Sequence, residues 1–228
     1  MQRARRLTSV VSLAVVGVLA IGACGRSAPT VAAYVGDHSY SQSDVDQVID
    51  QVKGQVPPDR QAELRRTVVR MMVLRDVATD YAKAHNLSVP TIDPVAFAQQ
   101  SNLPPGVRFT EIAVGYSAAM EAVQQSVKSA VPTEADQREA HSHATVQGQP
   151  VTDAFEKVQQ YFGEEQIGKA VGLRNLLNDA IGQADVSINP RYGDLIYQVP
   201  VQIGQATSWL TVPLTKDDRP VSDLSPGA

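Results

Sequence analysis

The chain has 228 residues, of which 43% are hydrophobic, 19% charged and 5% aromatic, and its formal net charge is −4. This length and mixture fit one or two domains with a substantial core and exclude a disordered or fibrous chain. The single cysteine excludes a disulfide framework and a Cys-rich zinc site. The acidic balance argues against nucleic acid as a partner, because phosphate binding requires clustered Lys and Arg.

Residues 1–23 have the layout of a secretory signal. Three arginines lie within residues 1–6, and the apolar run VVSLAVVGVLAIGA follows at residues 10–23. A basic start followed by roughly a dozen apolar residues is typical of an export signal and is short for a membrane span. A buried helix that starts the fold is the less favoured alternative.

The end of this run, Ile21-Gly22-Ala23-Cys24, resembles the lipobox of bacterial lipoproteins. The resemblance implies that the chain is cleaved before Cys24, that this cysteine is lipidated by acyl chains such as palmitate, and that the protein is extracytoplasmic and anchored to the cell membrane. Two or three acyl chains on one residue anchor a protein stably, whereas a single chain does not. A free thiol after ordinary signal cleavage is the alternative. Residues 24–30 are then a lipidated tether.

Cleavage also changes the charge of the chain. Residues 1–23 carry three Arg and no acid, so their removal leaves 17 basic and 24 acidic residues and a net charge of −7. Such a chain has no electrostatic attraction to an anionic bilayer, and the lipid alone is expected to hold it there.

Residues 31–52 predict a short β element followed by a helix. The stretch VAAYVGDHSY at residues 31–40 is of β type and is broken at Gly36, which indicates two very short strands around a turn. Ser41 and Asp44 have the spacing of a capping box. The valines and isoleucine that follow recur at helical spacing and form one apolar stripe: Val45, Val48, Ile49 and Val52.

The best-defined helix is expected over residues 59–85. Its apolar positions keep the helical period: Leu64, Val68, Met71, Leu74, Ala78 and Tyr81. Asn86 stands where a left-handed cap is expected, and Pro90 follows soon after it.

Four further helical segments are expected after Pro90, at residues 93–100, 110–129, 133–144 and 155–181. Asp93 caps the first, and Thr133 with Asp136 opens the third. Residues 147–152 are expected to be a linker. Three glycines interrupt the last segment and indicate close helix packing or a kink: Gly163, Gly168 and Gly172.

The composition changes to β type from residue 185. The runs IYQVPVQIG and SWLTVPL predict a terminal hairpin, in which Pro200 and Pro213 suit edge positions only. The lone Trp209 is either a packing anchor or, if exposed, an interface residue. The fold class is therefore mainly α, with a short N-terminal β turn and a small β-rich C-terminal segment. The expected divisions are a signal peptide (1–23), a tether (24–30), a helical domain (31–193), a β-rich extension (194–214) and a disordered tail (215–228).

This order of elements resembles the N-terminal domain of the SurA and PrsA family of envelope chaperones. The matching segments are VAAYVGDHSYSQSDVDQVI, LRRTVVRMMVLRDVATDYAKAHNLSV, the Pro-Thr-Glu-Ala-Asp start at Pro132 and DVSINPRYG at residues 185–193. Many members also contain a parvulin domain, a prolyl isomerase with a Gly-Gly-x-Leu-Gly stretch, and no such stretch occurs in this chain. The resemblance thus implies the helical chaperone module without the isomerase.

No residue pattern predicts a catalytic or metal site. His141 and His143 are two positions apart on a helix and point away from each other, so they do not form a zinc pair, and Glu139 with His143 is expected to be a surface pair. Asp44 suits the start of its helix, and Asp46 and Asp50 suit a solvated face. No nucleophile elbow, Walker loop or dinucleotide fingerprint is present. We therefore expect a protein that is not an enzyme and needs no cofactor or metal.

Soft and aromatic residues give the one indication of polypeptide binding. Five of them are candidates for an adaptable groove between helices: Met71, Met72, Tyr81, Tyr116 and Met120. The alternative is that they form the core between two helices. The function expected is chaperone-like binding of unfolded or extracytoplasmic polypeptides by a lipid-anchored protein. A solute-binding or transport-associated envelope lipoprotein is the alternative, and an envelope hydrolase is the least favoured.

Overall fold

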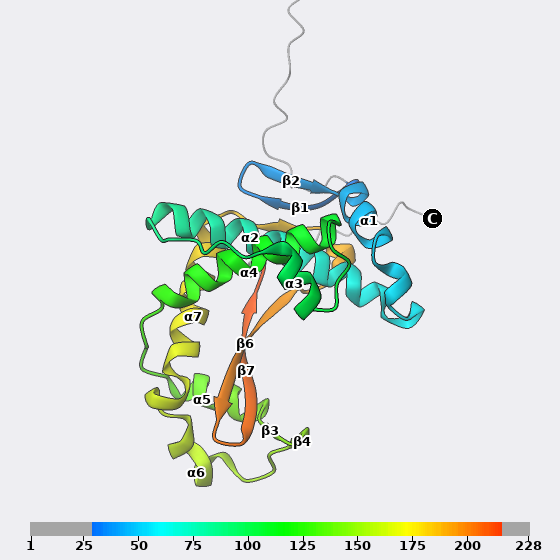
Figure 1. Ribbon diagram of the computed structural model, residues 1–228. Helices are drawn as coiled ribbons and strands as arrows, with labels where there is room; N and C mark the ends of the chain where they lie inside the picture. Colours follow the sequence, from blue (N-terminus) through cyan, green and yellow to red (C-terminus); the bar gives the residue numbers. More distant parts are fainter. Residues whose placement is uncertain (1–28, 216–228) are drawn as a thin grey trace, which may run out of the picture.

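The computed structural model describes residues 29–215, so Cys24, the lipobox and the expected tail from residue 216 onward lie outside the described residues. The described part is mainly helical, with seven α-helices and two small sheets. A helical body is at the top of Figure 1, and a long β-hairpin extends downward from it beside one helix. None of the described helices is both long and apolar enough to span a membrane.

Seven α-helices and four short 3₁₀ turns form the helical part of residues 29–215. The helices are α1 (Gln42–Asp50), α2 (Gln61–Ala84), α3 (Pro94–Gln100), α4 (Arg108–Ser126), α5 (Glu134–Ser142), α6 (Phe155–Val158) and α7 (Glu164–Gln183), and the 3₁₀ turns are η1 (Lys53–Gln55), η2 (Pro58–Arg60), η3 (Gln159–Phe162) and η4 (Pro190–Tyr192).

The strands form two separate antiparallel sheets. The strands are β1 (Val31–Val35), β2 (His38–Ser41), β3 (Thr145–Val146), β4 (Gln149–Pro150), β5 (Ser187–Ile188), β6 (Ile196–Ile203) and β7 (Ala206–Pro213). The first sheet has the order β2-β1-β5, and the second has the order β4-β3-β7-β6. Strands β1 and β5 lie far apart in the chain and close the helical body at its upper surface (Figure 1).

Local capping explains where several helices begin and end. Ser41 and Asp44 form a complete capping box at α1, and Thr133 and Asp136 form a second one at α5, as the sequence predicts. Asn86 has a φ of 53° and ends α2 in the left-handed region. These starts and stops depend on neighbouring residues, which is why the sequence locates them.

The prediction of a linker at residues 147–152 is wrong. Gln147 and Gly148 have φ angles of 51° and 79° and form the turn of a short hairpin between β3 and β4. Two consecutive residues with positive φ give the mirror-image turn that matches strand twist. Strand β3 also pairs with β7, where Thr145 lies opposite Thr207, so this hairpin extends the second sheet.

Helix α4 ends at Ser126, three residues before the expected end, because the chain must pass close to α7. Residues 127–130 cross α7 at Gly168 and Gly172, and the Ala130 N–H donates to the Gly168 carbonyl over 3.0 Å. A Cβ on Gly172 would lie well inside van der Waals contact with the Lys128 carbonyl oxygen. Gly168 and Gly172 do indicate close packing, but their partner is this connecting segment and not a helix, whereas Gly163 stands at the start of α7.

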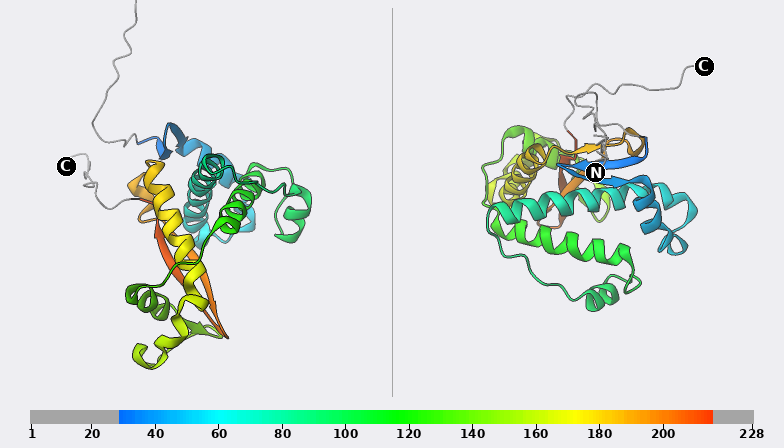
Figure 2. Two further views of the ribbon diagram at one scale, coloured as in Figure 1. Left: turned by 90° about the vertical axis from the view of Figure 1, so that its left-hand side faces the viewer. Right: turned by 90° about the horizontal axis from the view of Figure 1, so that it is seen from above.

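One hydrophobic core joins the helices to the β6–β7 hairpin. Val68 and Val73 of α2 belong to the same buried cluster as Val199 of β6 and Leu210 and Val212 of β7. In the left view of Figure 2, α7 covers one face of the hairpin. The helical body and the hairpin are therefore held together by apolar burial, the main favourable contribution to folding.

Candidate functional site

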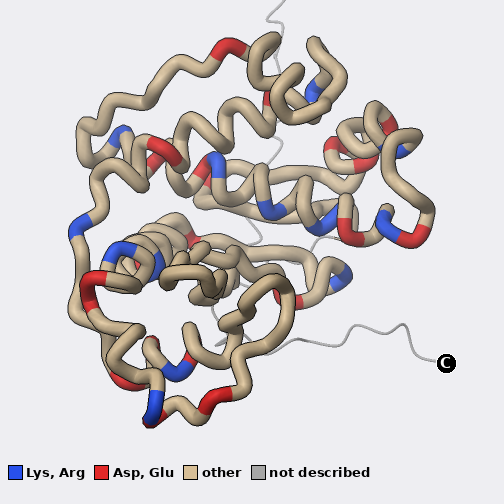
Figure 3. The backbone as a smooth tube through the Cα atoms, turned by 60° about the horizontal axis from the view of Figure 1, so that its bottom comes forward, with Lys and Arg blue, Asp and Glu red and all other residues tan. Residues whose placement is uncertain are grey.

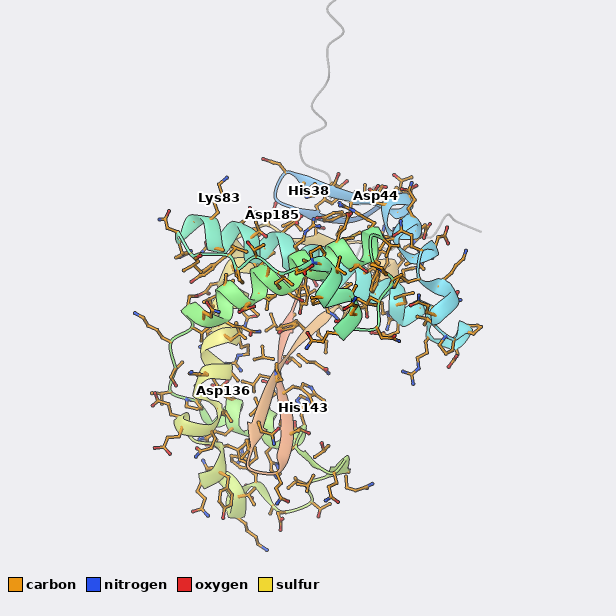
Figure 4. The ribbon with its side chains drawn as sticks, viewed as in Figure 1. His38, Asp44, Lys83, Asp136, His143 and Asp185 are labelled. Atoms are coloured by element: carbon orange, nitrogen blue, oxygen red, sulfur yellow. The ribbon has the colours of Figure 1, made fainter. Side chains whose placement is uncertain are left out.

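A polar pocket of about 360 Å³ lies between the first hairpin and the helices that follow it. Strand β2, helix α1, helix α2 and the first turn of α4 supply its walls. The lining residues are His38, Ser39, Tyr40, Asp44, Gln47, Val48, Gln51, Met72, Arg75 and Arg108. Figure 4 shows His38 and Asp44 close together on this side of the molecule. A pocket of this size is within the range that holds small ligands.

A hydrogen-bonded cluster forms one wall of this polar pocket. The Asp76 carboxylate lies 2.7 Å from His38 Nδ1 and also accepts from the Tyr40 hydroxyl. Arg75 donates to Asp76 through Nε at 3.0 Å and through Nη2 at 2.9 Å, and its Nη2 also donates to the Tyr40 hydroxyl at 2.6 Å. The side chains of Arg75 and Asp76 are only 21% and 15% exposed, so the two charges are largely shielded from water. The cluster fixes Arg75 in one position beside the pocket.

The electrostatics of the cluster keep the phenol of Tyr40 protonated. Burial raises the pKa of Tyr40 well above its ordinary value, and the hydrogen bond to Asp76 raises it further. A neutral phenol that donates to Asp76 and accepts from Arg75 serves as a bridge between the two charges. This arrangement orients the Arg75 cation beside the pocket.

A second cavity of about 250 Å³ lies at the corner where the β6–β7 hairpin leaves the helical body. This corner cavity is lined by Thr67, Arg70 and Met71 of α2, Tyr116 of α4, and Tyr197 and Gln198 of β6. Tyr116 and Tyr197 interact in this cavity, and burial is the main cause that raises the pKa of both phenols. The Arg70 guanidinium donates to the Ile196 carbonyl at 3.4 Å.

The hairpin has one open face that continues from the corner cavity. The two-residue turn after Ile203 sets a register in which Val199 lies opposite Leu210 and Pro200 opposite Trp209. Val199 and Leu210 are buried, whereas the side chains that alternate with them form the face opposite α7. We call Gln198, Pro200, Gln202, Thr207, Trp209 and Thr211 the hairpin face. Strands β6 and β7 carry no Lys, Arg, Asp or Glu. Figure 3 shows that basic and acidic residues are otherwise distributed over the described chain.

The residues of α5 hold Trp209 at the edge of this face. The His143 ring stacks on the Trp209 ring with the centroids 4.6 Å apart and the planes 12° apart, and its Nδ1 lies 3.1 Å from the Trp209 carbonyl oxygen. Glu139 accepts from the Thr211 backbone N–H at 2.7 Å. The expected surface pair of Glu139 with His143 is therefore wrong, because both side chains contact β7. His141 instead contacts Phe155 and Phe162, with ring centroids 5.7 Å apart in each case.

Only two of the five candidate groove residues come together. Met71 and Tyr116 both line the corner cavity. Met72 and Met120 are each 3% exposed and belong to the core, so they do not form an open groove between helices, although Met72 also lines the separate polar pocket. Tyr81 stacks on His85, with centroids 3.9 Å apart, about 15 Å along α2 from Met71.

Of the hairpin face, the sequence singles out only Trp209, which is partly exposed in the structure, and it predicts neither Tyr197 nor the other residues of the face. The signal was present in the alternation of β6, where Gln198, Pro200 and Gln202 are exposed and Val199 and Val201 are buried. Tyr197 meets α2 and α4 only because the hairpin folds back onto the helical body, which no local pattern in residues 194–214 encodes. The polar pocket likewise combines residues from four separate parts of the chain.

Known proteins do not assign a function to either cavity. Within residues 29–215, no group of three His, Cys, Asp or Glu side chains is placed to hold a metal ion. No protein-family model, no curated protein and no solved structure matches the chain. The chemistry of the two cavities and of the hairpin face is therefore what carries the functional inference.

Proposed function

We propose that this chain is a lipid-anchored, non-enzymatic protein of the bacterial cell envelope that binds unfolded or extended extracytoplasmic polypeptides. The observation that carries this proposal is the uncharged hairpin face, which is continuous with the corner cavity through Gln198. The membrane anchor is the proposed lipid on Cys24.

The composition of this surface suits many different polypeptide sequences. Trp209 and Pro200 offer apolar area, and the glutamines and threonines beside them offer adaptable donors and acceptors. Met71 in the corner cavity is flexible and polarizable, a property used at promiscuous binding surfaces. The six residues of the hairpin face carry no charge, and Arg70 of the corner cavity places one cation beside them.

The proposed contact is made by side chains and not by addition of a strand to β6. Strand β6 is at the edge of its sheet, and Ile203 and Ala206 close the two-residue turn as a hydrogen-bonded pair. The backbone groups of Gln198, Pro200 and Gln202 then point to the open edge. Pro200 has no N–H at the centre of that edge, which blocks a continuous ladder with a new strand.

The family relationship also remains a proposal. We propose that α1, α2 and the β1–β2 hairpin form a module of the SurA and PrsA type without the prolyl isomerase. Its support is the order of a strand-turn-strand unit, a capped short helix and a long helix ending at Asn86. Fold likeness alone does not determine function, so the hairpin face carries the functional argument.

The test uses the full chain purified in detergent. Aggregation of a chemically unfolded client is followed by light scattering with the wild type and with the double variant Gln198→Glu/Gln202→Glu. The variant places two charges beside Trp209 without removing a buried group, so suppression of aggregation is expected to weaken at least about tenfold. The control variant Gln160→Glu/Gln183→Glu adds the same two charges at exposed glutamines outside the hairpin face. It is expected to suppress aggregation as well as the wild type does.

Two results would contradict polypeptide binding at the hairpin face. If the wild type neither slows aggregation nor shows binding to peptides of the client, the chaperone function is wrong. If both double variants lose suppression equally, net charge and not the hairpin face is responsible.

A second function is favoured by the polar pocket. A solute-binding or transport-associated lipoprotein would use a pocket with convergent polar groups, and this pocket has both the volume and the side chains for that role. The pocket and the corner cavity share no lining residue, so separate variants distinguish the two functions.

A further inference from the structure

The polar pocket is lined by hydrogen-bond donors that have no acceptor. Arg75 uses Nε and Nη2 for Asp76 and Tyr40, and its Nη1 carries two N–H groups with no acceptor among residues 29–215. Gln51 uses its Oε1 to accept the Phe109 backbone N–H, which leaves the amide NH₂ for another partner. Gln51 directly follows α1, Arg75 lies in α2, and both line the same pocket.

A third donor group lies at the mouth of the pocket. Arg108 is the first residue of α4 and bonds Glu111 through Nη1 at 3.0 Å. Its side chain is 57% exposed, so the remaining N–H groups of its guanidinium are accessible. Arg75, Gln51 and Arg108 therefore present donors around one cavity from α2, from the residue after α1 and from the start of α4.

The carboxylates near the pocket already have partners of their own. Asp44 accepts from the backbone N–H and the hydroxyl of Ser41 at the start of α1. Asp76 accepts from Arg75 and Tyr40 and faces His38. These acids neutralise the arginines over distance, but they leave the inward donors without a bonded acceptor. No buried side-chain nitrogen or oxygen of the described residues lacks a hydrogen-bond partner, so these free donors face solvent, where an acceptor from outside the chain can replace water.

The Arg75 side chain is held in one position before any ligand binds. A Cβ on Gly115 would lie 3.1 Å from Arg75 Cδ, so the glycine leaves the space through which this side chain passes. Tyr40 and Asp76 then fix the guanidinium by hydrogen bonds. A fixed donor loses little conformational entropy on binding, which favours recognition of a planar, two-oxygen acceptor.

We propose that the polar pocket binds the carboxylate group of a small ligand, with Arg75, Gln51 and Arg108 as its donors. A carboxylate matches two or three converging N–H groups, and the pocket volume admits a small organic acid or the end of a peptide. The proposal does not depend on polypeptide binding at the hairpin face, because the two surfaces share no residue.

The experiment measures ligand-dependent shifts of Tm on the full chain in detergent, at constant ionic strength. The probes are sodium succinate, a tripeptide with a free C-terminus, the same tripeptide as its C-terminal amide, and sodium chloride. Carboxylate probes are expected to raise Tm in a saturable manner, since a ligand that binds only the folded state stabilises it. The tripeptide amide and chloride are expected to cause no saturable shift. Binding of succinate indicates a free acid as the source, and binding of the tripeptide acid alone indicates a polypeptide C-terminus.

The decisive variant is Gln51→Glu. It keeps an acceptor for the Phe109 N–H but replaces the NH₂ by a second, negatively charged oxygen, so the carboxylate affinity is expected to fall at least about tenfold. Arg108→Gln, at a half-exposed site, is expected to weaken binding several-fold even if Gln51→Glu unfolds the chain. Arg138→Gln removes an arginine of similar exposure outside the pocket and is expected to leave the affinity unchanged.

The proposal is overturned by either of two results. The first is no saturable shift with any carboxylate probe up to tens of millimolar. The second is a shift of equal size in the wild type, Gln51→Glu and Arg108→Gln, which would mean that anions stabilise the chain without using this pocket.

Discussion

Arg174 of α7 and Asp136 of α5 form an ion pair, with 2.6 Å between Arg174 Nη2 and Asp136 Oδ1. The two side chains are 15% and 8% exposed, so the pair lies in the interior beside the β6–β7 hairpin. Arg174 also reaches Glu139 at 3.4 Å, and Glu139 in turn accepts from Thr211 of β7. One arginine thus links α7, α5 and the strand that carries Trp209, and Figure 4 shows Asp136 and His143 on this lower part of the molecule.

Removal of this arginine should destabilise the lower part of the fold. Arg174→Met keeps the apolar stem but leaves Asp136 as a buried charge without its cation, and we expect the free energy of unfolding to fall by about 3 kcal/mol. Urea unfolding measures this change. Lys53→Met breaks an exposed pair with Asp50 and is expected to change stability little. Equal effects of the two variants would show that the Arg174 pair is no more important than a surface contact.

Acidic pH should remove the stabilisation that the ion pair of Arg174 and Asp136 provides. Burial acts to raise the pKa of Asp136, but the Thr133 backbone N–H and Arg174 outweigh it, and the pKa is lowered in the folded state. A lowered pKa means that the stabilisation is present above the unfolded value of about 3.9 and is lost as the pH falls below it, through the folded pKa. Unfolding free energies of the wild type are therefore expected to decline more steeply below about pH 4 than those of Arg174→Met. Parallel pH profiles would contradict this assignment.

The crossing at Gly172 predicts a strong intolerance of any side chain. Gly172→Ala would place a Cβ against the Lys128 carbonyl, and backbone atoms cannot move aside as a flexible side chain can. We expect the free energy of unfolding to fall by about 1–3 kcal/mol, even though alanine favours a helix. Gly54→Ala is the control, because no atom lies within 4 Å of its added Cβ. A neutral Gly172→Ala would mean that residues 127–130 do not pack against α7 as described.

Features set by neighbouring residues were predictable, and features set by distant pairing were not. The capping boxes of Ser41 and Thr133 and the left-handed Asn86 depend on three or four adjacent residues, and the sequence locates all of them. Strand β3 consists of two residues that become a strand only by pairing with β7, about 60 positions later. No local propensity of Thr145-Val146 carries that information.

For the proposed binding surfaces, too, local residue character was predictable and contacts between distant segments were not. The soft and aromatic character of Met71 and Tyr116 was visible in the sequence, and both residues line the corner cavity. Helical spacing could not distinguish them from Met72 and Met120, because all four lie on broad apolar faces of α2 and α4. Tyr197 joins Tyr116 only because the hairpin returns to the helical body, some 80 residues along the chain. A residue pattern read along one helix cannot contain that contact.

The tyrosine pair of the corner cavity predicts how the fold responds to alkali. Burial raises the pKa of Tyr116, and the interaction with Tyr197 raises it further, so the folded state holds the phenol proton more tightly than the unfolded chain. The corresponding stabilisation is complete below the unfolded value of about 10 and is lost as the pH rises from there through the folded pKa. The free energy of unfolding of Tyr116→Phe should therefore decrease less between pH 9 and pH 11 than that of the wild type.

Urea unfolding across this pH range measures the difference, and the absorbance of the phenolate reports the titration itself. Tyr161→Phe removes a phenol that is 55% exposed and keeps the number of tyrosines equal to that of Tyr116→Phe. If both variants lose stability above pH 10 in the same way as the wild type, Tyr116 does not hold its proton in the folded state. The Tyr116 phenol would then be accessible to water in the folded state, and the corner cavity would be less enclosed than the burial of Tyr116 implies.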